Sequence, residues 1–217
     1  MLKESVEAVT ADIDRICSAE GIDRSGIRIL AATKTVTPER INMLPGLGIT
    51  LAGENRVQEF IEKKDSVHGI DWHFIGALQT NKAKHVVGNV SLIHSVDRES
   101  LADEIERLSA ARGITSDVLL EVNMGGEESK SGASPQRLDE LFEYVSAKPH
   151  VRVRGLMSVL PIGAKESLYD DLYTLYSKRR AGLFDTLSAG MSGDYPTAIK
   201  HGANLVRLGS IIFGKRS

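Results

Sequence analysis

The spacing of hydrophobic positions changes along this chain, and these changes predict where helices and strands lie. Near the N-terminus, apolar residues recur every three or four positions, which is typical of one buried helix face. This stripe consists of Leu2, Val6, Val9, Ile13 and Ile16. Short runs rich in apolar and β-branched residues then alternate with amphipathic segments. The pattern predicts an N-terminal helix followed by a repeated β/α alternation.

The apolar runs predict eight strands, and the amphipathic segments predict a helix after nearly every strand. The expected strands are 28–34, 49–53, 72–76, 90–95, 117–122, 152–157, 183–188 and 204–208. The expected helices are 37–44, 55–66, 80–88, 97–112, 135–147, 166–181 and 194–202. Several of them open with a helix-start signal, such as Thr37 followed by Pro38 and Asp194 before Pro196.

Eight strands that alternate with helices describe an α/β protein, a single-domain (β/α)8 barrel of the TIM type with an extra N-terminal helix. We expect one domain over residues 1–217, because 217 residues can bury one sizeable core. The alternative is a doubly wound open sheet that binds a dinucleotide. Against it, no Gly-x-Gly-x-x-Gly follows the first strand, and Gly46-x-Gly48 precedes a strand instead.

Composition and charge argue against several classes of protein. Lys and Arg number 27 against 29 Asp and Glu, so no electrostatic footprint for nucleic acid or an acidic membrane appears. The single cysteine, Cys17, excludes an intrachain disulfide. No metal-ligand spacing is formed by His68, His85, His150 and His201. The charged N-terminus lacks a signal-peptide core and no apolar stretch is as long as a membrane span, so we expect a cytoplasmic protein.

Lys34 is the most informative polar residue, because it ends the first apolar run and a helix start follows directly. In a β/α barrel the carboxyl ends of the strands gather on one rim, where active sites are built. A lysine at that rim can form a Schiff base with a carbonyl compound, including the cofactor pyridoxal 5′-phosphate (PLP). Position alone also allows Lys34 to be an ordinary solvated lysine.

Two later loops have the composition of a phosphate cradle. Ser192 and Gly193 follow the seventh expected strand, and Gly209-Ser210 follows the eighth and leads into one potential helical turn. Barrels often bind phosphate with these two loops and a short extra helix. Each glycine alone could belong to an ordinary turn. Together with Lys34, however, the loops indicate PLP that is held at its aldehyde and at its phosphate.

Other catalytic interpretations of the rim are weaker. Residues 190–194 approach the Gly-x-Ser-x-Gly motif of hydrolases, but Asp194 stands where the final glycine belongs. His73 and His94 at strand ends could act as bases, although a polar core or rim histidine is the commoner outcome. A phosphosugar enzyme on a barrel would explain the cradle but would leave Lys34 without a role.

Seven stretches together resemble the PLP homeostasis protein family, the single-domain relatives of the alanine racemase barrel. They span nearly the whole chain in order: 31–35 (AATKT), 53–59 (GENRVQE), 72–82 (WHFIGALQTNK), 129–132 (SKSG), 154–158 (RGLMS), 187–194 (LSAGMSGD) and 206–214 (VRLGSIIFG). Two positions depart from the commoner forms of these motifs. Ala77 stands where a larger residue is usual, and Gly193 replaces a polar one, so details of the pocket differ.

The resemblance implies a role in cofactor binding for seven residues and implies no metal. Lys34 would form the Schiff base with PLP, and Arg207 would face the pyridine nitrogen. The other five would hold the phosphate (Ser192, Gly209 and Ser210) or lie beside the ring (Asn55 and Met157).

The resemblance also favours a PLP carrier over an enzyme. Such a carrier binds PLP, limits free aldehyde and hands the cofactor on, so PLP-dependent apo-enzymes are the candidate partners. The alternative is an amino-acid racemase or a related enzyme of the same fold type. Racemase relatives add a C-terminal β domain that supplies a second acid/base residue at a dimer interface, whereas this sequence ends at Ser217. We therefore expect a monomer that holds PLP without efficient turnover.

Overall fold

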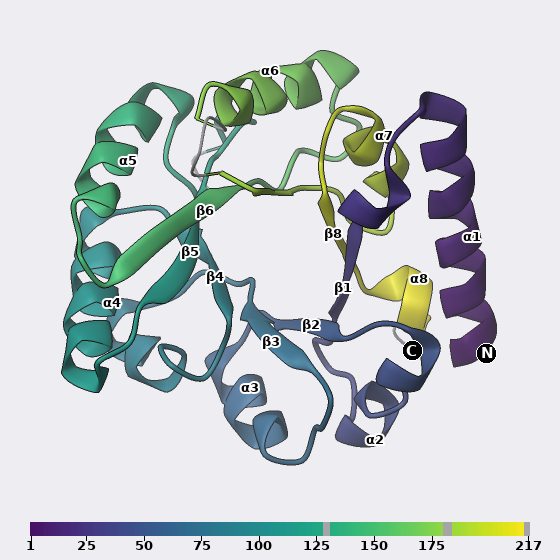
Figure 1. The fold of residues 1–217 in the computed structure, drawn as a ribbon, viewed down its shortest axis with the longest axis horizontal. Helices are drawn as coiled ribbons and strands as arrows, with labels where there is room; N and C mark the ends of the chain where they lie inside the picture. Colours follow the sequence, from purple (N-terminus) through teal and green to yellow (C-terminus); the bar gives the residue numbers. More distant parts are fainter. Residues whose placement is uncertain (128–130, 180–183, 215–217) are drawn as a thin grey trace.

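The computed structural model describes residues 1–127, 131–179 and 184–214. Eight parallel strands form a closed barrel in sequence order, and the first strand pairs with the last to close it. The strands are β1 (Arg28–Ala32), β2 (Leu51–Glu54), β3 (Asp71–Phe74), β4 (Leu92–Val96), β5 (Ser116–Glu121), β6 (Val151–Met157), β7 (Thr186–Ser188) and β8 (Leu205–Leu208). In Figure 1 they surround the centre of the molecule, with the helices outside them. The predicted (β/α)8 barrel is confirmed.

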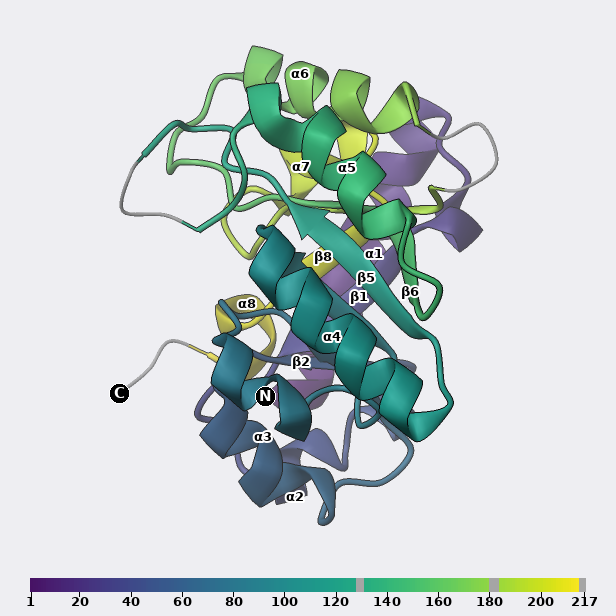
Figure 2. The same ribbon diagram turned by 90° about the vertical axis from the view of Figure 1, so that its left-hand side faces the viewer.

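Helices and short 3-10 segments connect the strands on the outside of the barrel, as the side view in Figure 2 shows for α3, α4 and α5. The helices are α1 (Leu2–Glu20), α2 (Pro38–Ile41), α3 (Val57–Lys64), α4 (Glu99–Arg112), α5 (Leu138–Ser146), α6 (Glu166–Ser177), α7 (Tyr195–Lys200) and α8 (Ser210–Phe213). The 3-10 segments are η1 (Arg24–Gly26), η2 (Pro45–Leu47), η3 (Thr80–His85) and η4 (Pro135–Arg137). None of the helices in the described residues could span a membrane, because none is both long and apolar enough.

The extra N-terminal helix packs along α7 and α8, next to the seam where β8 meets β1 (Figure 1). All five residues of its predicted apolar stripe are buried. Cys17 is buried on the same helix, and this burial raises the pKa of its thiol, which suits a packing role. The helix ends at Gly21, whose φ of 66° is the left-handed conformation that glycine adopts readily.

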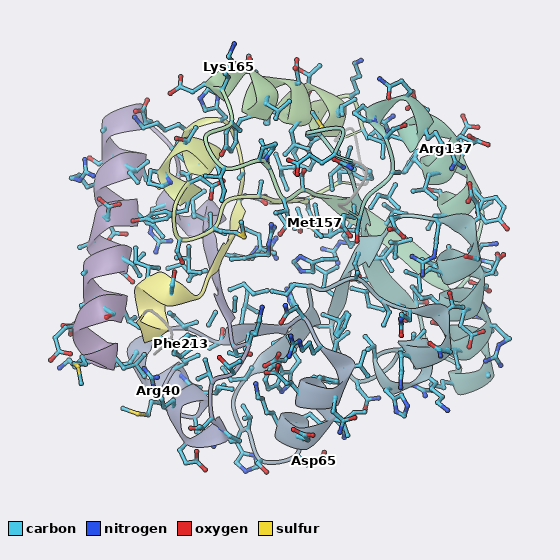
Figure 3. All side chains as sticks on the ribbon, turned by 180° about the vertical axis from the view of Figure 1, so that it is seen from behind. Arg40, Asp65, Arg137, Met157, Lys165 and Phe213 are labelled. Carbon is cyan, nitrogen blue, oxygen red and sulfur yellow. The ribbon has the colours of Figure 1, made fainter. Side chains whose placement is uncertain are left out.

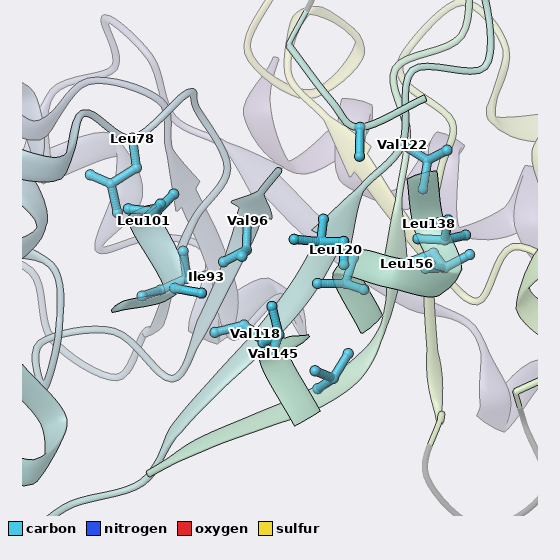
Figure 4. Packing of buried hydrophobic residues seen from close by; sticks show 14 of the residues in the cluster. Leu78, Ile93, Val96, Leu101, Val118, Leu120, Val122, Leu138, Val145 and Leu156 are labelled. Atoms are coloured by element: carbon cyan, nitrogen blue, oxygen red, sulfur yellow. The ribbon is translucent and has the colours of Figure 1, made fainter. Parts of the chain in front are cut away.

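The core has an outer layer between strands and helices and an inner cluster inside the barrel. Figure 4 shows part of the outer layer, where Ile93, Val118 and Leu120 of the strands approach Leu101 and Leu138 of the helices. The inner cluster consists of Leu30, Leu92, Leu119, Met157 and Leu205. Successive side chains of a strand point to opposite faces, so each strand can serve both layers.

Several predicted elements differ in their bounds from the observed ones, and three of these differences bear on the site or on its surroundings. The expected strand 28–34 ends at Ala32, and Lys34 lies in the following turn. The expected helix 80–88 is the shorter 3-10 segment η3, and Arg112 donates to the Lys84 carbonyl within it and to the Val87 carbonyl after it. The expected helix 166–181 is observed as far as Ser177. Parts of three predicted segments lie outside the described residues: 129–130 of the motif 129–132, 180–181 of the helix 166–181, and 183 of the strand 183–188.

Candidate functional site

A cavity of about 1050 Å³ opens at the carboxyl ends of the strands. Its walls come from segments that follow β1, β2, β3, β6, β7 and β8. Six of the seven predicted site residues line it: Lys34, Asn55, Ser192, Arg207, Gly209 and Ser210. The barrel therefore brings together residues that are up to 176 positions apart, from 34 to 210, in one cavity.

Lys34 lies in a tight turn that the Val36 N–H closes by donating to the Thr33 carbonyl at 2.9 Å. Thr35, the next residue in this turn, has a φ of 63°. A β-branched side chain rarely adopts this conformation, and Thr35 is the one non-glycine residue with positive φ in the described backbone. The Lys34 amine lines the cavity and has no hydrogen-bond or ion-pair partner among the described residues. A nucleophilic amine is thus held at the cavity wall without a competing partner.

Asn55 follows β2 directly, and its side chain carries an unsatisfied group. The Oδ1 atom is buried and has no hydrogen-bond partner within the described part of the chain. The Asn55 backbone passes close to Gly76, where an added Cβ would lie 2.2 Å from the Asn55 carbonyl oxygen. Only glycine allows this approach. A buried acceptor without a donor is unfavourable in the free protein, so a ligand that donates a hydrogen bond fits here.

The loops after β7 and β8 meet through the Ser192 hydroxyl. Its Oγ accepts hydrogen bonds from the backbone N–H groups of Gly209 and Ile211, both at 3.2 Å. A Cβ added to Gly209 would lie 3.3 Å from the Ala32 carbonyl oxygen, so glycine keeps this wall open. These N–H groups and the hydroxyl form a neutral donor set that suits a phosphate. No described histidine contacts Ser192, which agrees with the weakness of the hydrolase interpretation.

Asp194 stabilises the loop that carries Ser192. Its Oδ1 accepts the Met191 N–H at 2.7 Å, and its Oδ2 accepts the Tyr169 hydroxyl at 2.8 Å. Both carboxylate oxygens are therefore engaged in holding the loop of Ser192. Sequence reasoning identified Asp194 as a helix start but missed Tyr169, which lies on α6 and carries no local motif.

A chain of polar side chains runs from the cavity into the barrel. Arg207 lines the cavity and is 4% exposed; its Nη1 donates to Ser188 Oγ at 2.7 Å, and its Nη2 donates to the Ser158 carbonyl at 2.9 Å. Ser188 Oγ lies 3.2 Å from His94 Nδ1, and His94 Nε2 lies 2.9 Å from His73 Nδ1. Both Nη atoms of Arg207 are thus fixed by the barrel.

Burial determines the charges along this chain. It lowers the pKa of Arg207 to about 10, so the guanidinium stays protonated at neutral pH. Burial also lowers the pKa of His73 to about 4 and that of His94 well below its usual value, with the charge of each neighbour adding to the effect at His94. The two histidines are neutral core residues and do not line the cavity. The interpretation of them as polar core histidines is confirmed.

The residues around the cavity fit PLP. The unpartnered amine of Lys34 can meet an aldehyde, and the Ser192 and Gly209 cradle can meet a phosphate. The Nε atom of Arg207 makes no hydrogen bond among the described residues and can face a ring nitrogen. The buried Oδ1 of Asn55 can accept a hydrogen bond from such a ligand.

Comparison with known proteins agrees with this geometry. The family described as alanine racemase, N-terminal domain, matches residues 21–217. A pyridoxal phosphate homeostasis protein of Aquifex aeolicus is 42% identical over 98% of this chain and 97% of its own length. The chain belongs to the pyridoxal phosphate homeostasis protein family.

Two solved structures are similar over the whole barrel of this family member. A protein of Bifidobacterium adolescentis shares 33% sequence identity at a TM-score of 0.90, over 98% of this chain and 94% of that chain. PipY of Synechococcus elongatus PCC7942, solved with PLP bound, shares 29% identity at a TM-score of 0.80. The match covers 93% of this chain and 99% of PipY.

Met157 is the one predicted site residue of this family member that does not line the cavity. It is 1% exposed and belongs to the inner cluster, near the centre of the barrel in Figure 3. Ile75 and Val159 pack against that cluster and do line the cavity, so Met157 supports the wall from beneath. Its place in an apolar strand run gave no signal for this difference.

Sequence reasoning also missed parts of the cavity wall. Arg40 lines the mouth and its Nη2 donates to the Phe213 carbonyl at 3.0 Å; the two residues lie side by side in Figure 3. The loop 159–163 after β6 forms another part of the wall. Glu121 is buried at the end of β5 and does not line the cavity; burial together with Asp97 raises its pKa to about 7. A carboxyl at the end of an apolar run was the available signal for Glu121.

Proposed function

We propose that this protein binds PLP in the cavity, holds it through a Schiff base on Lys34, and buffers it or transfers it within the cell. One observation carries the proposal: an amine without a partner lies on the same cavity as a cradle of backbone N–H groups. An aldehyde and a phosphate on one small molecule match these two features. The relatives named pyridoxal phosphate homeostasis protein and the PLP-bound PipY support the same ligand.

Each site residue has a role in holding the cofactor. When bound, PLP supplies an electrophilic aldehyde and an electron-withdrawing ring. Lys34 would hold the aldehyde carbon, while Ser192, Gly209 and Ser210 would hold the phosphate. Arg207 stays charged at neutral pH, and its Nε–H would donate to the ring nitrogen as an acceptor. The buried Oδ1 of Asn55 would accept a hydrogen bond from the cofactor.

Reduction with borohydride tests the assignment directly. The purified protein is mixed with PLP, reduced and digested, and the pyridoxyl adduct is mapped by mass spectrometry. We expect the adduct on the peptide that contains Lys34. Lys63 is an internal control, because its three N–H groups are engaged in the folded protein. An adduct on another lysine alone would reject Lys34, and no aldimine absorbance before reduction would reject the cofactor.

We further propose that the protein acts as a cytoplasmic monomer and passes PLP to PLP-dependent apo-enzymes. In the test, the loaded protein is mixed with an apo-enzyme in the presence of an excess of a compound that scavenges free PLP. Direct transfer should restore the activity of the apo-enzyme despite the scavenger. Sedimentation at micromolar concentration should give the mass of one chain. Activation that stops when the scavenger is present would leave buffering as the function and remove direct transfer.

The alternative function is slow racemase-type chemistry, because residues 21–217 match the family described as alanine racemase, N-terminal domain. Incubating the loaded protein with L- and D-amino acids in deuterated water reports exchange of the α-proton. We expect slow exchange at most. Several turnovers per second that disappear in Lys34→Ala would make the protein an enzyme.

A further inference from the structure

A second lysine, Lys63, is buried next to the cavity. Its ammonium group makes several hydrogen bonds, whereas the Lys34 amine makes none among the described residues. Lys63 lies on α3, and its side chain is 9% exposed. Its ammonium group donates to the Thr33 carbonyl at 3.0 Å, to Glu54 Oε1 at 2.7 Å and to Glu59 Oε2 at 3.0 Å. An ammonium group has three N–H donors, and all three are used. Lys63 therefore serves as a fixed cation rather than as a reactive amine.

The partners of Lys63 hold the chain on both sides of Lys34. Before Lys34, the Thr33 hydroxyl donates to Glu54 Oε1 at 2.7 Å, and the Thr33 carbonyl accepts from Lys63. After Lys34, the Thr35 N–H donates to Glu59 Oε2 at 2.7 Å. We call Glu54, Glu59 and Lys63 the clamp. It fixes the residues that flank Lys34 and leaves the Lys34 amine itself without a contact.

The clamp also accounts for the unusual backbone of Thr35. A threonine at φ 63° is strained, and such a conformation persists only where the surroundings impose it. The hydrogen bond from the Thr35 N–H to the Glu59 carboxylate is the contact that fixes this peptide. Removing the carboxylate would let Thr35 return to an extended or helical conformation, and the turn would no longer direct Lys34 to the cavity wall.

The charges of the clamp are arranged so that Glu59 remains ionised. Although burial opposes it, the Thr35 N–H and Lys63 lower the pKa of Glu59. Burial raises the pKa of Glu54, which is 0% exposed and whose Oε2 has no partner. Lys63 contacts both carboxylates, at Glu54 Oε1 and Glu59 Oε2, and the Glu59 carboxylate whose pKa is lowered is the one that binds the Thr35 N–H.

We propose that Glu59, with Lys63 and Glu54, positions Lys34 for covalent capture of an aldehyde. This inference rests on the proposed function, because it concerns the amine that would bind PLP. The three residues do not line the cavity, so they act through the turn of Thr33 to Val36. A clamp that only anchored α3 to β2 would instead affect stability and the binding of every ligand alike.

Two ligands distinguish these roles. PLP has an aldehyde, whereas 4′-deoxypyridoxine 5′-phosphate has the same ring and phosphate without it. We expect Glu59→Ala to weaken PLP binding about ten-fold, since a charge-assisted contact at the turn is lost, and to leave the affinity for the deoxy compound unchanged. Glu59→Gln keeps an acceptor for the Thr35 N–H and should recover part of the PLP affinity. Glu62→Ala is the matched control, because Glu62 is exposed on the same helix and contacts Gln58.

Hydrogen exchange of the Thr35 amide gives a readout that needs no cofactor. In the free protein we expect this amide to exchange faster in Glu59→Ala than in the wild type or Glu62→Ala. Equal weakening of both ligands, or unchanged PLP affinity with unchanged Thr35 exchange, would overturn the positioning role. If the wild type formed no adduct on Lys34, the proposed function would fail, while the Thr35 exchange would still report whether the clamp holds the turn.

Discussion

The two ends of the barrel treat their polar groups in opposite ways. At the amino end of the strands, charged groups satisfy one another. Asp117 accepts from Arg152 at 2.7 and 2.8 Å and from Arg154 at 2.6 Å, and Arg154 also pairs with Asp185. Arg28 closes the interior by donating to the Thr186 hydroxyl at 2.7 Å. These ion pairs and hydrogen bonds stabilise the amino end of the barrel without any ligand.

At the carboxyl end, several polar groups lack the hydrogen-bond or ion-pair partners that the charged groups at the amino end have. The Lys34 amine has no partner among the described residues, and the Asn55 Oδ1 is buried without a donor. Thr35 holds a strained backbone conformation beside them. Unsatisfied polar atoms and strain lower stability, so their concentration at one end marks where the fold gives up stability for binding. Changes at the two ends should therefore have different consequences.

The largest effect on binding is expected for Lys34→Ala. Wild-type protein with PLP at 100 times its Kd should gain about 2.7 kcal/mol of unfolding free energy. Lys34→Ala should lose most of this gain, because the covalent bond cannot form. Without PLP, the variant should unfold within about 0.5 kcal/mol of the wild type, since Lys34 has no partner to lose. Urea unfolding with and without PLP measures both values, and an undiminished gain would contradict the assignment.

The phosphate cradle should show the next largest effect. Gly209→Val places a Cβ 3.3 Å from the Ala32 carbonyl oxygen and directs methyl groups at the cradle, so PLP affinity should fall by well over ten-fold. Ser192→Ala removes one hydroxyl and should cost about ten-fold. Gly46→Ala is the control, because Gly46 does not line the cavity and its added Cβ would meet no atom within 4 Å. Equal affinities in all three variants would place the phosphate elsewhere.

The same contrast explains how far the sequence alone could lead. Strand and helix periodicity predicted the barrel, because each strand and helix must bury an apolar face and the faces leave a regular pattern. Boundaries that depend on a distant side chain were not predictable. The segment 80–88 is a 3-10 segment only as far as His85, and Arg112 of another helix donates to its Lys84 and Val87 carbonyl groups, contacts that no local pattern shows.

The candidate site was predictable where a residue type is needed by the chemistry. Lys34 and the Ser192 and Gly209 loops stood out only in combination, because an amine and two loops of phosphate-binding type match the two ends of one ligand. The supporting residues did not stand out. Tyr169 and Lys63 act only through contacts with loops distant in sequence, and a tyrosine or lysine on an amphipathic helix resembles an ordinary surface residue.

The pH dependence of the unfolding free energy tests the interior of the barrel, where His73 lies between the two ends. Burial lowers the pKa of His73 from 6.5 to about 4, so the unfolded chain takes up this proton first as the pH falls. The contribution is present above pH 6.5 and is lost towards pH 4, by about 3 kcal/mol. The charge of Asp71 raises this pKa and that of Arg28 lowers it. Unfolding free energies of the wild type and His73→Gln should converge by this amount between pH 7 and pH 4, and parallel curves would show that the pKa of His73 is not lowered.

The smallest effect is expected at the closed end, where Asp117→Asn should lower stability without touching the cavity. The substitution keeps the size of the side chain and removes the charge that binds Arg152 and Arg154, so unfolding free energy should drop by about 1–2 kcal/mol. Asp65→Asn breaks an exposed pair with Lys64 and should change it by less than about 0.5 kcal/mol. PLP affinity should be the same in both variants. If Asp117→Asn weakened PLP binding as well, the polar chain inside the barrel would couple its two ends, and the division between a stabilising end and a binding end would be wrong.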